Sequence, residues 1–455
     1  MNEFEQMKDD LLGRIERGLK HGQAKGAKSL DLYIIKSNEL AINMDAGIIT
    51  AQRGGTIGVG CRCVIDRKIG FASASGITES SVDFAIESAI SGAKLNQPDD
   101  RWESFIQNAK TGKEGIIDSS VLDISSEEAV LGADTIFQEA KDYDPRITSV
   151  SGGVYVGFGA FAVGNTEGIA KASATTGTFG QSYITAVENG KTKTGFDYIM
   201  DRGVPSFDGI GTKGAEKAIK LLSAASLGKS EQTKFIFDPI AAGQFIKTAL
   251  SNSVNGKSVV EGRSSFADRI GDQVGVETLN IYDDGQILED PNVQAIDGEG
   301  YPRSTTPIIE KGVLKTFIFD SYYAKTYGAE STGNASRAGP QSYESLPTVS
   351  PTTISVTPGS KDLDGLIAEI GNGILVTDFL MGMMHSNLIS GDFSVVSPSS
   401  FVIENGEVKH PLEAVTIAGN LYNAFNQISS FGNDNKLTFM GKVPSIAFDG
   451  FTVSG

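Results

Sequence analysis

Residues 57–65 read IGVGCRCVI, a run in which apolar side chains alternate with glycine or arginine. Such alternation is typical of a β-strand that turns one face toward a core. The turn Asp66-Arg67-Lys68 and the following Phe71-Ala72-Ser73 predict an antiparallel return strand. Amphipathic helices are expected before and after these strands, over residues 3–20 and from residue 79. The chain therefore opens as a helix, an antiparallel meander and a second helix.

The same order of elements is predicted a second time. Ser125 and Glu128 have the spacing of a capping box at the start of a helix that runs to about residue 142. Glycine-rich strands with an Asn189-Gly190 turn are expected over residues 147–200, and a helix over residues 213–225. The two units suggest an internal structural repeat within an N-terminal domain of residues 1–228.

The second half, residues 229–455, is predicted to be a mostly β domain. A short strand at 234–238 leads into an amphipathic helix that ends near residue 252, and helices are also expected over 321–327 and 362–370. Tight hairpin turns are predicted at Asp284-Gly285, Lys311-Gly312 and Asn405-Gly406. The predicted fold class is α+β, with two domains rich in antiparallel sheet and amphipathic helices.

Composition excludes several kinds of partner. The 455 residues include 39 Lys and Arg against 56 Asp and Glu, a formal net charge of -17. Such a surface repels phosphate backbones and anionic lipids, so direct nucleic-acid and membrane binding are disfavoured. No run approaches the roughly 20 apolar residues of a membrane span, and the first residues lack the pattern of a signal peptide. A cytoplasmic protein is expected, with Cys61 and Cys63 as reduced, buried strand thiols.

Side-chain motifs for catalysis are missing from the sequence. The three histidines, His21, His385 and His410, have no second histidine within a helical turn, so a helical zinc motif is absent. Cys61 and Cys63 alone would make an incomplete metal site. The sequence also lacks a Gly-x-Ser-x-Gly nucleophile elbow, and its glycine pairs near residue 55 lead into a strand and not a helix. We predict no catalytic residue and no metal site in this chain.

Polar and glycine-rich segments gather in the last 80 residues. They are residues 387–394, 404–407, 417–421 and 431–434. Such segments can hold an extended peptide by adding it to a sheet edge, and they can equally be simple turns. The residues alone leave both interpretations open.

These segments resemble the TldD/PmbA family, and specifically its PmbA branch, which is also called TldE. The resemblance extends over nearly the whole chain. It is carried by residues 31–76, Asp297-Gly298-Glu299-Gly300, residues 309–314, Ser331-Thr332-Gly333-Asn334-Ala335 and the C-terminal segments above.

Catalytic TldD-type members are similar to zinc peptidases with a His-Glu-x-x-x-His helix and a later cysteine ligand. With Gly262 and Phe266 as anchors, the resemblance aligns the helical ligands with Lys247, Thr248 and Asn252, and the cysteine with Met440. These four side chains cannot complete a zinc site. Zinc is therefore expected in a TldD-like partner and not in this chain. The three helical residues could line a cavity or face solvent, and their polarity favours exposure.

The resemblance implies a non-catalytic subunit that forms a heterodimer with a TldD-like zinc metallopeptidase and acts on unfolded peptides. The candidate peptide-binding residues are Asn387, Gly391, Asp392, Phe393, Asn433 and Asp434. Alternatives are a self-sufficient hydrolase with an unrecognised site and an interaction protein that modulates DNA gyrase or its regulators. A homodimer of the isolated chain also stays open.

Overall fold

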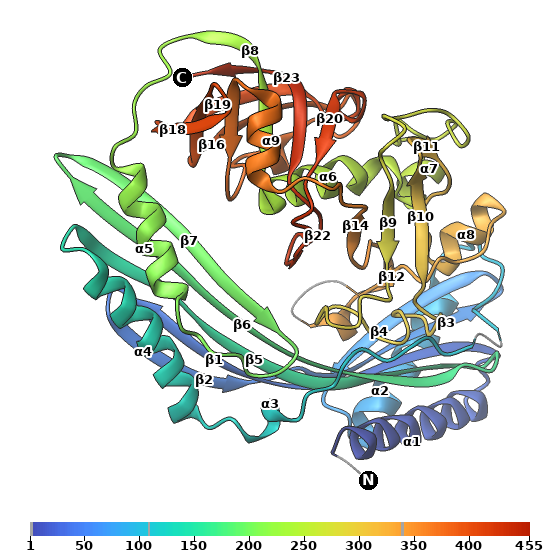
Figure 1. Cartoon of the computed structure of the whole chain (residues 1–455). Coiled ribbons are helices and arrows are strands. Elements are labelled where there is room, and N and C mark those ends of the chain that lie inside the picture. Colours follow the sequence, from blue (N-terminus) through green and yellow to red (C-terminus); the bar gives the residue numbers. More distant parts are fainter. Residues whose placement is uncertain (1–2, 108–109, 338–340) are drawn as a thin grey trace.

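The computed structural model describes residues 3–107, 110–337 and 341–455, and a long curved sheet is its largest element (Figure 1). The strand order is β4-β3-β1-β5-β6-β7, with β2 paired to β1, and every pair is antiparallel. The strands are β1 (Ser29–Asp45), β2 (Ile48–Gly54), β3 (Ile57–Ile65), β4 (Lys68–Ser75), β5 (Ile147–Asn165), β6 (Ala170–Glu188) and β7 (Lys191–Asp201). The meander predicted from residues 57–73 is β3 and β4.

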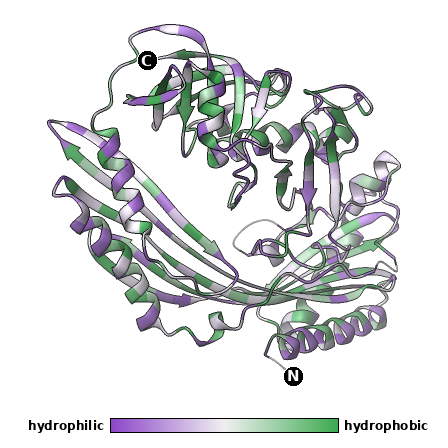
Figure 2. Ribbon diagram, in the orientation of Figure 1, coloured by the Kyte–Doolittle hydropathy of each residue, from purple (hydrophilic) through white to green (hydrophobic). Residues whose placement is uncertain are grey.

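Helices cover the outer, convex face of this sheet (Figure 1). They are α1 (Glu3–Ala24), α2 (Glu79–Leu95), α3 (Ser120–Asp123), α4 (Ser126–Tyr143) and α5 (Ile210–Leu221). Figure 2 shows hydrophilic as well as hydrophobic residues along α1, and its buried side is formed by Phe4, Met7, Leu11 and Ile15. The order helix, strands, helix occurs twice, first around β1–β4 and then around β5–β7. The predicted repeat of elements is thus present within one continuous sheet.

Helix α5 begins three residues before the predicted start. Its first backbone N–H groups are capped by a distant carboxylate, since Glu139 on α4 accepts hydrogen bonds from the N–H of Gly209 and of Gly211. A helix N-terminus leaves such N–H groups without partners inside the helix. The cap comes from a residue 70 positions away, so local sequence did not reveal it.

The C-terminal part, residues 230–455, contains a sheet ordered β16-β19-β23-β8-β15-β17-β18 with β20 on β23, a sheet ordered β11-β10-β9-β14-β22-β21, and the pair β12-β13. The strands are β8 (Ser230–Phe237), β9 (Ile281–Asp284), β10 (Thr305–Glu310), β11 (Val313–Leu314), β12 (Ala335–Ser336), β13 (Thr348–Val349), β14 (Ile354–Val356), β15 (Gly373–Val376), β16 (Asp392–Ser397), β17 (Ser400–Glu404), β18 (Glu407–Leu412), β19 (Val415–Asn420), β20 (Ile428–Phe431), β21 (Leu437–Thr438), β22 (Gly441–Lys442) and β23 (Ile446–Ser454). The helices are α6 (Pro239–Ser253), α7 (Gly256–Val260), α8 (Ser321–Tyr327), α9 (Leu363–Ile370) and the 3-10 turns η1 (Ser342–Glu344), η2 (Met383–His385) and η3 (Asn423–Asn426). The predicted α+β fold rich in antiparallel sheet is confirmed.

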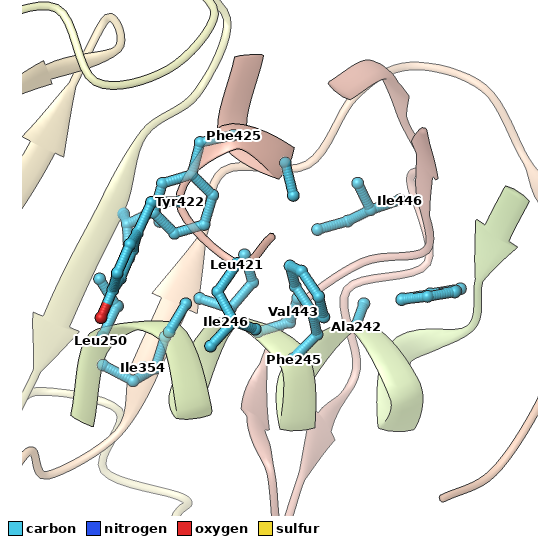
Figure 3. Packing of buried hydrophobic residues seen from close by; sticks show 14 of the residues in the cluster. Ala242, Phe245, Ile246, Leu250, Ile354, Leu421, Tyr422, Phe425, Val443 and Ile446 are labelled. Atoms are coloured by element: carbon cyan, nitrogen blue, oxygen red, sulfur yellow. The ribbon is translucent and has the colours of Figure 1, made fainter. Parts of the chain in front are cut away.

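Helix α6 is anchored in the C-terminal core by its apolar face. Asp238 caps its N-terminus by accepting a hydrogen bond from the N–H of Ala241 at 2.8 Å. Figure 3 shows Ala242, Phe245, Ile246 and Leu250 of α6 packed against side chains from β14, β23 and the segment around η3. Lys247, which is exposed on α6, lines a cavity together with Tyr33 and Phe161 of the curved sheet.

Most predicted turns are confirmed. Asn189-Gly190, Lys311-Gly312 and Asn405-Gly406 all have the positive φ angles of tight hairpins. The hairpin predicted at Asp284-Gly285 is wrong: β9 ends at Asp284, which pairs with Thr305 at the far end of a connection formed by residues 285–304. That connection contains Asp297 and Glu299, which bind distant parts of the chain.

Cys61 and Cys63 are buried and unpaired on β3, as predicted. Burial raises the pKa of the Cys63 thiol to about 11 and also raises the pKa of Cys61. Both therefore remain thiols at neutral pH. In the described part of the chain, no helix is both long and apolar enough to cross a membrane.

Candidate functional site

A cavity of about 720 Å³ lies between the inner face of the curved sheet and the C-terminal part. The sheet contributes Tyr33 and Phe161, and the C-terminal part contributes Lys247 of α6, Arg337 and residues 438–441. The described charged residues that line it are Lys247, Arg303, Arg337 and Asp290. The lining is thus more basic than the chain as a whole, which carries a net charge of -17.

A second cavity, of about 700 Å³, adjoins the first. Both are lined by Lys247 and Met440, so the two cavities meet at these side chains. The second cavity is largely apolar, and Lys247 is the sole charged residue among the described residues that line it. Its methionines are Met381, Met383, Met384 and Met440. The two cavities that share Lys247 and Met440 are together called the groove: the first contributes its basic residues and the second its methionines.

The four positions that the resemblance aligns with metal ligands occupy different environments. Lys247 lines both cavities and Thr248 lines the second. Asn252 is only 8% exposed, and its amide nitrogen donates hydrogen bonds to the carbonyl oxygens of Arg263 at 2.6 Å and Leu388 at 3.1 Å. The expectation that polarity would place all three helical residues toward solvent is therefore wrong for Asn252, because two carbonyls satisfy its buried amide.

A buried ionic network joins the two parts of the chain beside the first cavity. Arg62 of β3 donates two hydrogen bonds of 3.1 Å to Asp31 of β1 and one of 2.9 Å to Glu299. The other oxygen of Glu299 accepts from the N–H of Ser321 at 2.9 Å. The Arg62 guanidinium also lies 4.8 Å from the ring centre of Phe105. Each buried charge has a partner, as burial requires.

The segments that carried the family resemblance meet at this network. Asp297 accepts hydrogen bonds from the N–H groups of Glu299 and Tyr301, which shapes the turn, and from the N–H of Ala335 at 3.0 Å. Asn334 donates in turn to the carboxylate of Asp283 on β9. Burial raises the pKa of Asp297 and of Asp283 to about 6 each. These residues therefore order the C-terminal side of the junction, which Glu299 joins to Arg62 of the sheet.

Family models and known proteins agree on what the chain is similar to. Models described as the PmbA/TldA metallopeptidase domain 1, central domain and C-terminal domain match residues 30–93, 119–222 and 230–455. The chain belongs to the PmbA/TldD family. The metalloprotease PmbA of Escherichia coli O157:H7 is 24% identical, over 93% of this chain and 94% of that protein.

Two further relatives match this PmbA/TldD family member over almost the full length of both proteins. An uncharacterized protein of Methanocaldococcus jannaschii is 26% identical, over 96% of this chain and 99% of that protein. The crystal structure of TldE from Thermococcus kodakarensis is 25% identical with a TM-score of 0.88, and the match covers 97% of this chain and 100% of that chain. Similarity to PmbA and TldE identifies the PmbA, or TldE, branch.

The metal that the family description implies does not fit the aligned residues here. Zinc in proteins binds thiolate, imidazole and carboxylate groups, whereas Lys247, Thr248, Asn252 and Met440 offer an ammonium, a hydroxyl, an amide already bound to two carbonyls, and a thioether. Over residues 3–107, 110–337 and 341–455, no three side chains of His, Cys, Asp or Glu are grouped so that they could hold a metal ion. No reaction step is therefore assigned to a metal in this chain.

The six candidate peptide-binding residues fall into two places, and none of them is among the described residues that line the 720 Å³ cavity. Asn387 and Gly391 lie in the loop that leads to Asp392, the first residue of β16. Asn387 accepts a hydrogen bond from the N–H of Ile389, and Asn420 donates to Asp392 at 3.0 Å. Asn387 and Asp392 are exposed there.

Asn433 and Asp434 lie in a second loop, where Asp434 accepts hydrogen bonds from the N–H and hydroxyl of Ser445. The side chain of Phe393 is 4% exposed and packs edge-on against Phe245 and Phe451. It is part of the core, so a peptide could contact only its backbone. Peptide binding by the six residues stays a prediction.

A second polar contact between the parts was not anticipated. The Lys217 ammonium on α5 donates to the carboxylate of Asp378 at 3.0 Å and to the carbonyl of Phe196 at 2.7 Å. Asp378 also donates its N–H to the carboxylate of Asp238. Burial and the charge of Asp378 raise the pKa of Asp238 to about 7. Lys217 and Asp378 are 161 residues apart, and the only local signal was a single aspartate within the apolar residues 374–380.

Proposed function

We propose that this chain is the non-catalytic, PmbA/TldE-like subunit of a zinc metallopeptidase complex. It forms a heterodimer with a TldD-like subunit that holds the zinc. The chain completes a chamber for unfolded peptides, and its groove at Lys247 and Met440 holds the peptide in extended form while the partner cleaves it.

The set of side chains at the aligned ligand positions carries this proposal. A hydrolytic zinc lowers the pKa of a bound water, and it needs several protein ligands to remain bound. The ammonium of Lys247 repels a cation, and the amide of Asn252 is committed to two carbonyl groups. Lys247 on the same helix nevertheless lines both cavities, which supports a place for a peptide there.

The experiment compares the purified chain, a TldD-like subunit from the same source, and their mixture. Hydrolysis of an unstructured peptide and zinc content are measured for each sample. We expect zinc in the TldD-like subunit and in the mixture, none in this chain alone, and fast hydrolysis only when both subunits are present. Stoichiometric zinc and chelator-sensitive hydrolysis in the isolated chain would contradict the proposal.

A further inference from the structure

We propose that Lys247 binds a carboxylate of an extended peptide whose neighbouring apolar side chains lie on the methionines of the second cavity. This inference rests on the proposed function and specifies the chemistry that the groove recognises. It adds a carboxylate-binding residue, Lys247, at the point where the two cavities meet.

The charge on Lys247 is not neutralised within the described structure. No described carboxylate lies within 4.0 Å of its ammonium group, and the side chain is exposed to the cavities. Lysine has three N–H donors and no acceptor, so its natural partner is an anion or a carbonyl oxygen. An incoming carboxylate supplies both the charge and the acceptors.

The other described charged residues of the first cavity are already engaged within the protein. Asp290 is 2% exposed and its carboxylate already accepts hydrogen bonds from Asn292 and Thr353, so it is a poor partner for Lys247. Arg303 donates to the oxygens of Gly333 and Thr352, and its charge also lowers the pKa of the buried carboxylates of Asp283 and Asp297, against the larger effect of burial, so it is engaged within the protein. Arg337 is paired with Asp31. Among the described charged residues of this cavity, Lys247 is therefore the cation that remains available to an incoming anion.

The second cavity determines which part of the ligand lies on the other side of Lys247. Met381 and Met384 are 58% and 86% exposed, although large apolar side chains are usually buried. Methionine is flexible and polarizable, so a methionine-lined surface adapts to apolar side chains of different shapes. An extended peptide therefore places its carboxylate at Lys247 and adjacent apolar side chains on Met381 and Met384.

Isothermal titration calorimetry with the full-length chain, alone and mixed with the TldD-like subunit, tests this proposal. The probes are the hexapeptide Ala-Leu-Ser-Leu-Ala-Leu with a free C-terminal carboxylate, its C-terminal amide, and an amide in which glutamate replaces the last alanine. Amidation is expected to weaken binding roughly tenfold, the usual value of one charge-assisted hydrogen bond. In Lys247→Gln, the free acid and the amide should bind equally, while Lys247→Arg should keep the difference.

The matched control is Lys436→Gln, because Lys436 is exposed and is not among the residues that line either cavity. If amidation weakens binding and glutamate restores it, Lys247 binds either a C-terminal or a side-chain carboxylate. If glutamate fails to restore binding, the site is specific for the C-terminal carboxylate. Peptides that bind equally well with and without a carboxylate would overturn the role of Lys247 and leave the proposed function standing. If none of the probes binds in either sample, the role of Lys247 and the proposed function are both overturned.

Discussion

Arg62 and Lys247 are both cations, but their surroundings give them different roles. Arg62 is 6% exposed and has two carboxylates within hydrogen-bonding distance, whereas Lys247 has no described carboxylate within 4.0 Å. A buried charge is tolerated only with its partners in place, and a charge without a protein partner remains available to a ligand. The same physical rule thus separates a structural residue from a candidate binding residue.

Removal of the Arg62 charge should therefore destabilise the fold strongly. Arg62→Gln leaves Glu299 buried without its cation and leaves Asp31 with Arg337 alone, and loss of one partner from a buried ion pair costs about 3–5 kcal/mol. Urea unfolding measures the change in the free energy of unfolding. The control is Lys20→Gln, which removes an exposed pair with Glu16 and should leave the unfolding curve unchanged. Equal curves for the two variants would show that the junction does not depend on the Arg62 charge.

Strand β3 packs closely against the C-terminal part through its glycines. A Cβ atom on Gly60 would lie 2.3 Å from the carbonyl oxygen of Tyr343, and one on Gly58 would lie 2.4 Å from the Tyr343 ring. The lack of a side chain at Gly58 and Gly60 thus makes room for Tyr343, in addition to the twist and turn properties that glycine gives a strand.

Gly60→Ala is expected to lower the free energy of unfolding by about 1–3 kcal/mol, because the backbone around Tyr343 must move to relieve the contact. Chemical denaturation checks the value. Gly54→Ala is the matched control, since nothing lies within 4 Å of a Cβ at that position. A Gly60→Ala variant as stable as Gly54→Ala would mean that Tyr343 can withdraw at little cost.

Helix α8 gives a prediction for pH dependence. Its N-cap, Asp320, is 2% exposed and accepts a hydrogen bond from the N–H of Tyr323. Burial, followed by the charge of Glu299, raises the pKa of Asp320 to about 8, although Asp297 and Arg62 also act on it in opposite directions. An unfolded aspartate has a pKa of about 3.9. Because the folded state holds this proton more tightly, its stabilising contribution is complete below about pH 4 and is lost as pH rises through about 8.

Asp320→Asn keeps the cap and removes the titration. The parent should lose stability relative to this variant as pH rises from 4.5 to 8.5, so that the variant is the more stable protein at pH 8.5. Urea unfolding at several pH values measures the difference. Asp362→Asn, at the exposed N-cap of α9, is the matched control. A difference between Asp320→Asn and the parent that does not change with pH would refute the raised pKa.

Periodicity and capping residues were sufficient to predict many elements from the sequence. The Ser125–Glu128 capping box starts α4, and the helix predicted over 321–327 is α8. Elements defined by distant partners were not predictable: Glu139 sets the start of α5, and the connection after Asp284 closes through contacts of Asp297 and Glu299. The candidate site shows the same limit. Sequence alignment pointed to Lys247 and Met440, but only the folded chain shows that two cavities meet there.

At the scale of the whole molecule, the chain passes between its two parts once, through residues 222–229 after α5. Two sets of contacts far apart in sequence hold the parts together, one at Arg62 and Glu299 and the other at Lys217 and Asp378. Loop residues add further contacts, including Lys325 to the backbone of Ser104 and the N–H of Gly112 to Ala295. The 720 Å³ cavity at Lys247 lies between the parts, so its shape depends on this association, whereas the described residues that line the second cavity all belong to the C-terminal part.

The predicted boundary between domains 1–228 and 229–455 can be tested by cutting the chain there. A protease site inserted between Gly228 and Lys229 lies in an exposed segment, where insertions are best tolerated. After cleavage, we expect fragments 1–228 and 229–455 to co-elute in size-exclusion chromatography, because the buried contacts at Arg62 and Tyr343 do not depend on the covalent link.

Gly60→Ala should weaken the association of the cut fragments at least tenfold, whereas Gly54→Ala should not. Fragments that separate and unfold in the parent would show that neither half is an independent domain, and fragments that stay together equally well in Gly60→Ala would place the decisive contacts away from Tyr343.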